Sequence, residues 1–354
     1  MFFAYFFAAN KNICTFEKCL KSGIDSQCKM YFVELPDIGQ QKLSFYLAVE
    51  EYAARHIDVM PLFFYWQVEP TVIFGRNQNI ESEVNVEYCK KNNIHLFRRK
   101  SGGGCVYADL DNLMLCYIDE GDDVQLTYSN YTTLMNGALR RLGLKVETTG
   151  RNDVTIEGKK ISGSAFYHIP NGRNIVHSTL LYDTNIDNMV QSITPPSEKL
   201  VAKGVESVKS RIGLLKDYTS LPFSQIKKEL REMFCGDKVY KLNEKDLKEI
   251  RNIEQTYLDP QFLYGDRKHW NLKKRGRIEG CGELEIRMSV RNGIISSVEM
   301  GGDFFTIGDV GIMCGAMRGK PLDKATLKKV FDEYPPDNYV RGLDAERLLR
   351  MMLE

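Results

Sequence analysis

Two polar segments of the chain carry residue types that could bind and activate an anionic substrate. Residues 98–107 read RRKSGGGCVY, and residues 151–165 read RNDVTIEGKKISGSA. In the first segment, three consecutive glycines let the backbone approach a ligand with its N–H groups exposed, because no Cβ blocks the approach and positive φ costs little. Arg98 and Arg99 add fixed positive charge and forked hydrogen-bond donors. We therefore expect the first segment to bind an anion.

The second segment supplies a carboxylate and a lysine. Asp153 is a candidate metal ligand, since hard cations such as Mg2+ prefer carboxylate oxygen. A hairpin with Gly158 at its turn would place Lys160 at the start of the returning strand, within reach of a phosphate or a carboxylate. The small residues 162–165 leave room for a ligand beside this lysine; a solvated hairpin lysine is the alternative. Together the two segments indicate nucleotide chemistry.

The residues around the three glycines favour a fixed loop over a flexible turn. Residues 94–97 and 105–107 have the apolar and aromatic composition of strands, so the glycines would lie between two strands. The loop has no GxxxxGK followed by Ser or Thr, and no GxGxxG precedes a helix. A Walker A loop and a dinucleotide-binding fingerprint are therefore both excluded.

Composition excludes other classes of partner. The chain has 48 Lys and Arg against 47 Asp and Glu, a net charge of +1, so no overall field favours nucleic acid or an acidic membrane. The nine cysteines are odd in number and scattered, and none forms a CxxC with a matching partner. They indicate reduced thiols in the cytoplasm and no structural zinc.

A helix and several strands must position the two segments. From Ser44 the apolar residues follow the spacing of one helix face, which predicts an amphipathic helix over the core. Residues 62–66 and 71–74 are β-branched or aromatic and are predicted to be two strands joined by a turn. The polar residues 75–79 follow the second strand directly, so they either line a site or form a solvated turn.

We expect three parts along the chain. Residues 1–29 form an N-terminal extension that is disordered or not translated, with Met30 as an alternative start and a poor signal peptide as the other interpretation. Residues 30–240 form a catalytic domain, and 241–354 a separate C-terminal module. In that module we expect a helix capped by Asn243, a hairpin turning at Asn292-Gly293, and helices at 324–334 and 345–353.

The order of these motifs resembles that of the lipoate-protein ligases, which activate free lipoate with ATP and transfer it to a lysine of an acceptor domain. The resemblance covers residues 30–240 and continues more weakly to the C-terminus. The matching segments are FYLAVEE (45–51), GRNQN (75–79), RRKSGGG (98–104), RND (151–153), GKKISGSA (158–165), HSTLL (177–181) and KLVAKGVESV (199–208). The chain departs from the family at Ala108, Asp111 and Ser178, where the family usually has histidine, glycine and glycine.

The resemblance implies an α+β fold: a biotinyl/lipoyl transferase-like catalytic domain with a mixed, largely antiparallel sheet, and a small α+β accessory domain. It implies Lys160 and Asp153 as catalytic residues, with Mg2+ held by Asp153. The implied lipoate contacts are Arg76, Ser101, Gly102, Gly103, Lys160 and Gly163. The implied ATP contacts are Arg99, Gly104, Cys105, Val106, Tyr107 and Lys160. Residues 183–203 correspond to a loop that closes over the acyl-adenylate.

The implied partners are E2 subunits of 2-oxoacid dehydrogenase complexes or the glycine cleavage H protein, acted on by a monomeric enzyme. Two alternatives stay open. An octanoyl or lipoyl transferase on the same fold passes the acyl group through a cysteine thiolate, which is disfavoured because no cysteine lies between Cys116 and Cys235. The second alternative is a non-catalytic protein that only binds lipoate. The presence of Arg99, Asp153 and Lys160 counts against it.

Overall fold

The computed structural model describes residues 30–149, 152–170, 172–193, 210–264 and 270–354. The predicted N-terminal extension, Arg151, residues 194–203 of the predicted closing loop and the matching segment at 199–208 lie outside these residues. Among the described residues, no helix combines the length and the apolar character needed to cross a membrane.

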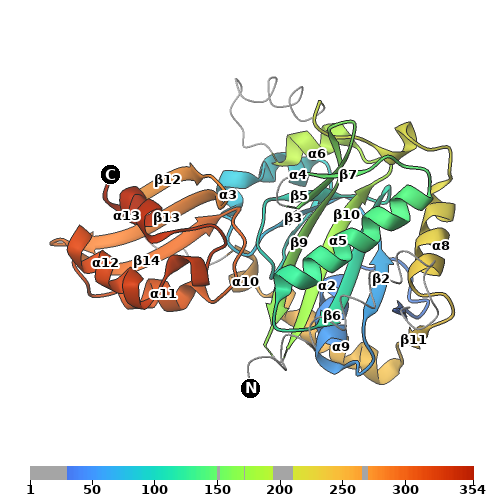
Figure 1. Cartoon of the computed structure of the whole chain (residues 1–354), viewed down its shortest axis with the longest axis horizontal. Coiled ribbons are helices and arrows are strands. Elements are labelled where there is room, and N and C mark those ends of the chain that lie inside the picture. The colour runs from blue at the N-terminus through green and yellow to red at the C-terminus, as the bar shows by residue number, and fades with distance from the viewer. Residues whose placement is uncertain (1–29, 150–151, 171, 194–209, 265–269) are drawn as a thin grey trace, which may run out of the picture.

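An eight-stranded sheet frames the larger part of the molecule, in the order β11-β1-β2-β6-β10-β9-β8-β7 (Figure 1). Strand β1 runs parallel to β2 and β11, and the other neighbouring pairs are antiparallel. The predicted mixed, largely antiparallel sheet is therefore confirmed. The strands are β1 (Tyr31–Glu34), β2 (Leu62–Trp66), β6 (Asn112–Glu120), β7 (Glu147–Thr149), β8 (Asp153–Ile156), β9 (Lys159–Ile169), β10 (Arg173–Leu181) and β11 (Val239–Lys241).

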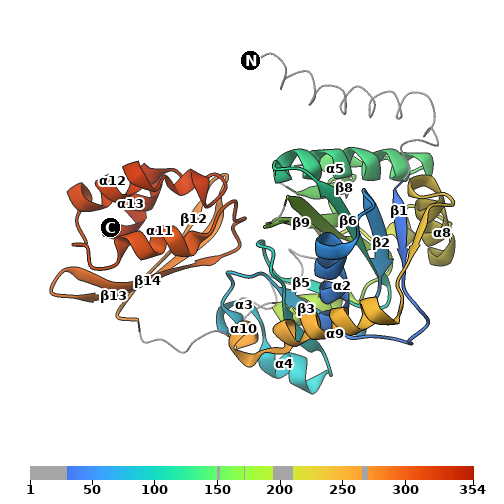
Figure 2. The same ribbon diagram turned by 90° about the horizontal axis from the view of Figure 1, so that it is seen from below.

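Helices cover both faces of this sheet (Figure 2). Helix α5 (Val124–Arg141) packs on one face against β6, β9 and β10, and α2 (Leu43–His56) packs against β6 and β10 on the other. The helix predicted from Ser44 is confirmed as α2, but it is buried from Leu43 to Ala54 instead of on one face alone. The reason is that α9 (Glu244–Leu258) lies along its outer side. Helix α8 (Phe223–Phe234) packs Phe234 edge-on against Phe63.

A second, three-stranded sheet carries the glycine loop. Its central strand β3 (Thr71–Phe74) is parallel to β4 (His95–Arg98) and antiparallel to β5 (Val106–Ala108). The glycines therefore link two strands of one sheet, as predicted. Strands β2 and β3 follow one another in the chain but belong to different sheets. The short helices beside this sheet are α3 (Ile80–Glu83), α4 (Val86–Lys91) and α6 (Ile186–Ile193).

The C-terminal part has its own sheet and core. Strands β12 (Leu272–Ile278), β13 (Gly282–Arg291) and β14 (Ile294–Gly302) form an antiparallel sheet covered by α11 (Val310–Met317), α12 (Lys324–Glu333) and α13 (Ala345–Leu353). Asn292 and Gly293 have φ of 49° and 75°, which confirms the tight turn predicted for this hairpin. The two predicted late helices are α12 and α13.

The boundary between the two parts follows the packing of α9. Asn243 caps this helix as predicted, through a reciprocal capping box with Asp246. Ile250 and Tyr257 of α9 belong to the core of the larger part, and α10 (Pro260–Tyr264) continues along it. Helices α9 and α10 therefore pack with the larger part, and the domain boundary at residue 240 stays a prediction.

Candidate functional site

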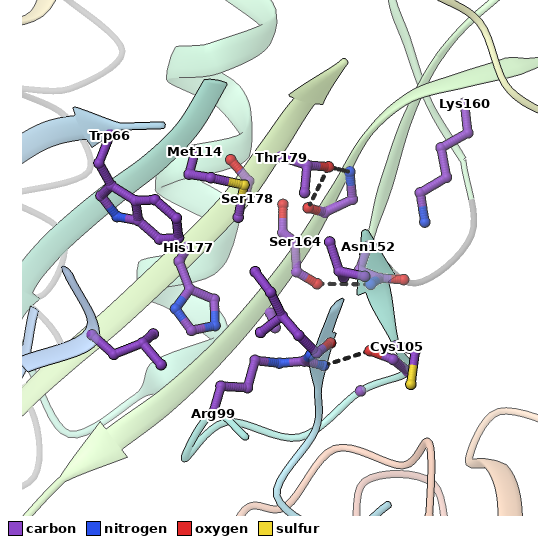
Figure 3. Close-up of a pocket in the computed structure, with 17 residues that line it drawn as sticks. Trp66, Arg99, Cys105, Met114, Asn152, Lys160, Ser164, His177, Ser178 and Thr179 are labelled. Carbon is purple, nitrogen blue, oxygen red and sulfur yellow. Dashed lines mark hydrogen bonds between the residues drawn. The ribbon is translucent and has the colours of Figure 1, made fainter. Parts of the chain in front are cut away.

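A pocket opens where the glycine loop faces strands β9 and β10 (Figure 3). Trp66 of β2 and Met114 of β6 lie at one end, which we call the apolar end, and Leu47 of α2 and Ile73 of β3 also line the pocket. The other end is polar, with Asn152, Lys160, Gly163 and Ser164. Figure 3 shows Trp66 and Lys160 at opposite ends of this group. The pocket suits a ligand with an apolar chain and one anionic end.

Lys160 is the cation at the polar end. Its Nζ lies 2.7 Å from Asp153 Oδ1, and the two side chains are 39% and 35% exposed, so both groups remain open to a ligand. Lys159 next to it is exposed and does not line the pocket, because successive strand side chains point to opposite faces. Gly163 makes room for the lysine: a Cβ there would lie 2.7 Å from both Cε and Nζ of Lys160.

Arg99 is a different kind of cation. It is 4% exposed and donates to the carbonyls of Ile73, Gly102 and Gly104, at 3.0, 2.7 and 2.7 Å. Burial lowers the pKa of Arg99 to about 10, which still leaves it charged at neutral pH. With its N–H groups pointing at the loop's own oxygens, Arg99 holds the glycine loop in shape.

A buried hydrogen-bond chain links the glycine loop to helix α2. Arg99 Nε donates to Ser101 Oγ at 3.0 Å, and Ser101 Oγ lies 2.7 Å from His177 Nε2. His177 Nδ1 lies 2.9 Å from Glu50 Oε2, and Trp66 Nε1 donates to the other oxygen of Glu50 at 3.3 Å. The donor order that satisfies each group runs from Arg99 through Ser101 and His177 to Glu50. Glu50 and Ser101 are fully buried.

Comparison with known proteins shows which family has this sequence pattern. Residues 42–235 match the family model of the lipoyl protein ligase A/B catalytic domain, and residues 268–352 match that of the bacterial lipoate protein ligase C-terminus. The lipoate-protein ligase LplJ of Bacillus subtilis is 31% identical over 335 residues, which cover 91% of this chain and 100% of that protein. The chain belongs to the lipoate-protein ligase family.

Two solved structures show the same fold. LipL1 of P. falciparum, solved with lipoate, superposes with a TM-score of 0.73 at 19% identity and covers 91% of this chain and 99% of its own. A lipoate-protein ligase A solved with ATP has a TM-score of 0.59 at 22% identity, covering 67% of this chain and 99% of its own. The second match spans a smaller share of this ligase than the first.

The cysteines of the ligase are poorly suited to covalent catalysis. Cys105 lines the pocket, but burial raises the pKa of its thiol to about 12, and its Sγ donates to Gln78 Oε1 at 3.3 Å. Burial likewise raises the pKa of Cys116 well above its usual value. A nucleophilic thiolate would not form at neutral pH at either position. This arrangement counts against the acyl-cysteine alternative.

The structure gathers most of the predicted site residues, but not all, around the pocket. Those that line it are Arg99, Gly103, Gly104, Cys105, Val106, Lys160 and Gly163. Asp153 reaches it through Lys160. Arg76 is exposed and borders a neighbouring groove instead, and the side chain of Tyr107 lies in the core beneath the small sheet. Ser101 and Gly102 belong to the glycine loop but do not line the pocket; Ser101 contacts His177 instead. The ligand contacts assigned to these residues remain predictions.

Two of the three departures from the family pattern, at Asp111 and Ala108, fit the local structure. Asp111 stands where glycine is usual, but it does not have positive φ, and its N–H donates to Asp109 Oδ1 at 3.1 Å. Asp109 also accepts from Thr184 and from the Asn185 N–H, which ties this turn to the start of α6. Ala108 is a fully buried residue of β5.

Proposed function

We propose that the ligase activates free lipoate with ATP to lipoyl-adenylate and transfers the lipoyl group to an acceptor lysine. The observation that carries this proposal is the polarity of the pocket, with Trp66 and Met114 at the apolar end and Lys160 at the other. The apolar end would take the dithiolane and the alkyl chain. The lipoate carboxylate would then lie beside the ammonium group of Lys160.

In the first step, a carboxylate oxygen of lipoate attacks the α-phosphorus of ATP, the P–O bond to the β-phosphate breaks, and pyrophosphate leaves. The reactants are both anions, and two unit charges at about 4 Å repel by roughly 1 to 4 kcal/mol, depending on the effective dielectric. Lys160 reduces this repulsion and stabilises the charge that develops on the α-phosphate. Gly163 leaves free the space that the end of the Lys160 side chain occupies.

Asp153 is the residue that would hold Mg2+. The ion usually binds one or two carboxylates, substrate phosphates and several waters, so a single half-exposed carboxylate beside the phosphate site fits it. Among the described residues, no cluster of three or more His, Cys, Asp and Glu side chains offers an all-protein metal cage. When bound with the nucleotide, the ion would neutralise phosphate charge.

In the second step, the free amine of an acceptor lysine attacks the acyl carbon, the bond to AMP breaks, and the amine loses a proton to solvent. The enzyme supplies no covalent nucleophile. The acceptors we propose are lipoyl domains of E2 subunits of 2-oxoacid dehydrogenases or the glycine cleavage H protein. We also propose that the ligase works as a monomer in the cytoplasm, in keeping with described cysteines that form no disulfide.

Lipoate-dependent exchange of labelled pyrophosphate into ATP tests this function, because it reports only the reversible first step. The ligase should exchange with lipoate and Mg2+ present and not when either is omitted. A transferase that uses a preformed acyl donor would show no exchange but would still lipoylate an acceptor domain from that donor. A protein that only binds lipoate would show neither activity.

A further inference from the structure

One segment of the C-terminal part contacts both the glycine loop, which lines the pocket, and the neighbouring polar loop 75–79. It runs from Gly301 at the end of β14 to Phe305, and we call it the clamp segment. The Gly302 N–H donates to the carbonyl of Asn77 at 2.9 Å, and the Gly103 N–H donates to the carbonyl of Phe304 at 3.2 Å. The first contact reaches the polar loop 75–79 and the second reaches the glycine loop. The C-terminal part therefore touches the ligand site directly.

Phe305 joins the core of the catalytic part. Its side chain is 4% exposed and belongs to that core, whereas the adjacent Phe304 packs in the core of the C-terminal part. The Phe305 ring stacks on Phe166 of β9, with ring centres 5.1 Å apart and planes 7° apart. It also faces the glycine loop, since a Cβ at Gly103 would lie 3.2 Å from its ring. The ring thus fills the space between the loop and β9.

The clamp segment also explains why position 102 is glycine. A Cβ at Gly102 would lie 2.5 Å from the Phe304 carbonyl oxygen, closer than two such atoms can approach. Gly102 does not line the pocket, so its missing side chain serves this contact between the two parts. Gly75 has the equivalent role inside the catalytic part, since its Cβ would meet the Gly103 carbonyl oxygen at 2.2 Å.

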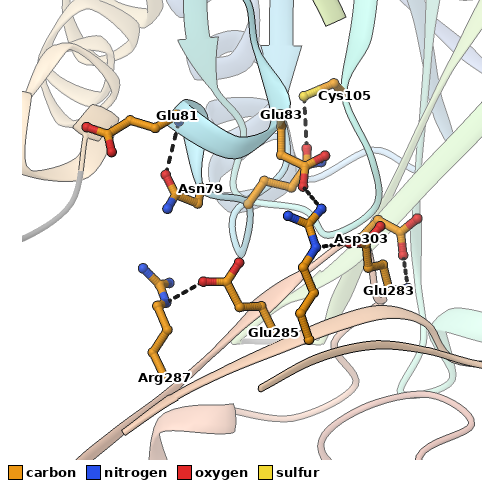
Figure 4. Close-up of polar contacts among 10 residues, drawn as sticks. Asn79, Glu81, Glu83, Cys105, Glu283, Glu285, Arg287 and Asp303 are labelled. Carbon is orange, nitrogen blue, oxygen red and sulfur yellow. Dashed lines mark hydrogen bonds and ion pairs between the residues drawn. The ribbon is translucent and has the colours of Figure 1, made fainter. Parts of the chain in front are cut away.

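A polar contact runs beside the clamp segment (Figure 4). Arg275 of β12 pairs with Glu83 of α3 at 3.3 Å, and the other oxygen of Glu83 accepts from Gln78 Nε2 at 3.1 Å. Gln78 Oε1 in turn accepts from the Gly75 N–H at 2.8 Å and from the Cys105 thiol. The chain of contacts passes from the C-terminal sheet to a residue that lines the pocket.

We propose that Phe305 is a positioning residue for the acyl site, through which the C-terminal part holds the glycine loop in the shape that binds lipoate. This inference rests on the function proposed above. Phe305 does not itself line the pocket. It acts through Gly103 and Phe166, so its loss widens the space behind the loop and lets the loop leave the pocket wall.

The test measures lipoate binding to the full-length ligase by tryptophan fluorescence, since Trp66 lines the pocket. Phe305→Ala should raise the Kd for lipoate by on the order of 10-fold or more, within the usual range of coupling between sites. Phe305→Leu, which keeps apolar volume without the stacked ring, should raise the Kd less. The KM for lipoate in pyrophosphate exchange should rise in the same order.

Two controls separate positioning from stability. Phe331→Leu alters a buried ring of the C-terminal core, so it should lower the melting temperature and leave the Kd unchanged. Ile307→Ala removes an exposed side chain two residues beyond Phe305 and should change neither quantity. A parental Kd in folded Phe305→Ala, or an equal rise in Phe331→Leu, would overturn the inference. A parental enzyme that neither binds lipoate nor exchanges pyrophosphate would refute the proposed function instead.

Discussion

The two sides of the pocket use positive charge in opposite ways. On the glycine-loop side, Arg99 is 4% exposed and its donors are directed at the loop's carbonyls and at Ser101. On the hairpin side, Lys160 is 39% exposed and forms an ion pair with Asp153. The first cation shapes the site, and the second remains available to a substrate. We therefore expect removal of Arg99 to reduce mainly stability and removal of Lys160 to reduce mainly activity, although both residues carry one positive charge.

The largest expected effect is at Lys160. Lys160→Ala should slow lipoyl-adenylate formation by on the order of 10² to 10³, because it removes a charge aimed at the developing transition state. Lys159→Ala is the matched control and should have little effect, since that side chain is exposed. Adenylate production and transfer from supplied lipoyl-adenylate should be measured separately, with melting temperatures. A parental rate in Lys160→Ala, or a dead Lys159→Ala, would show that the site is wrongly assigned.

Substitution of Arg99 should mainly lower the free energy of unfolding. Arg99→Lys cannot reproduce the forked contacts to Ile73, Gly102 and Gly104, and leaving such buried carbonyls unpaired should cost roughly 2 kcal/mol or more in the free energy of unfolding. Arg55→Lys, at a partly exposed pair with Glu51, should cost about 0.5 kcal/mol or less. Urea unfolding of both variants measures the difference. Equal costs would mean that the loop does not depend on Arg99.

A smaller loss is expected at Gly163. Gly163→Ala places a methyl group 2.7 Å from the Lys160 ammonium nitrogen, so the lysine must move away from the reacting groups. We expect adenylate formation to fall by about 10-fold, the scale of a displaced catalytic group. Gly315→Ala in α11, where a Cβ meets no atom within 4 Å, is the control. If Gly163→Ala retains full activity, Lys160 has another productive position.

The smallest effect should follow cysteine alkylation. Burial raises the pKa of Cys105 to about 12 and that of Cys89 to about 11, so little thiolate is present at pH 8. Iodoacetamide treatment with lipoate and ATP bound should therefore leave overall ligation nearly unchanged. Mass spectrometry would identify the modified thiols. Lost transfer with retained adenylate formation would indicate a thioester intermediate after all.

The sequence predicted the parts of the site that are local in the chain. Three glycines between strand-like residues and a turn at Gly158 determine their own geometry, so the loop and Lys160 could be placed without a structure. The exposure of Arg76 could not, because a polar residue after a strand is compatible with both a site and a solvated turn. The predicted boundary near residue 240 is uncertain for a related physical reason: the stripe of α9 shows that the helix packs, but not against which core, so this boundary stays a prediction.

Contacts between distant segments were beyond prediction from one sequence. Glu50 lies 127 residues from His177, and Glu50 sits within a helix pattern that gave no reason to expect a buried carboxylate. The other partner of His177, Ser101, lies 76 residues away in the chain. Phe305 lies in the C-terminal part, and nothing in its local pattern distinguishes a ring that serves the neighbouring core from one that serves its own. In each case the missing information was the identity of the partner.

The buried hydrogen-bond chain from Arg99 to Glu50 offers a way to measure how often the site opens. With Ser101 donating to His177 Nε2, the imidazole proton resides on Nδ1 and is enclosed against Glu50. Exchange of that proton with water requires the surrounding helix and loop to separate transiently. The exchange rate of this proton, measured from its NMR resonance, would therefore report how often the pocket opens in the resting enzyme. The measurement needs no substrate, label or turnover.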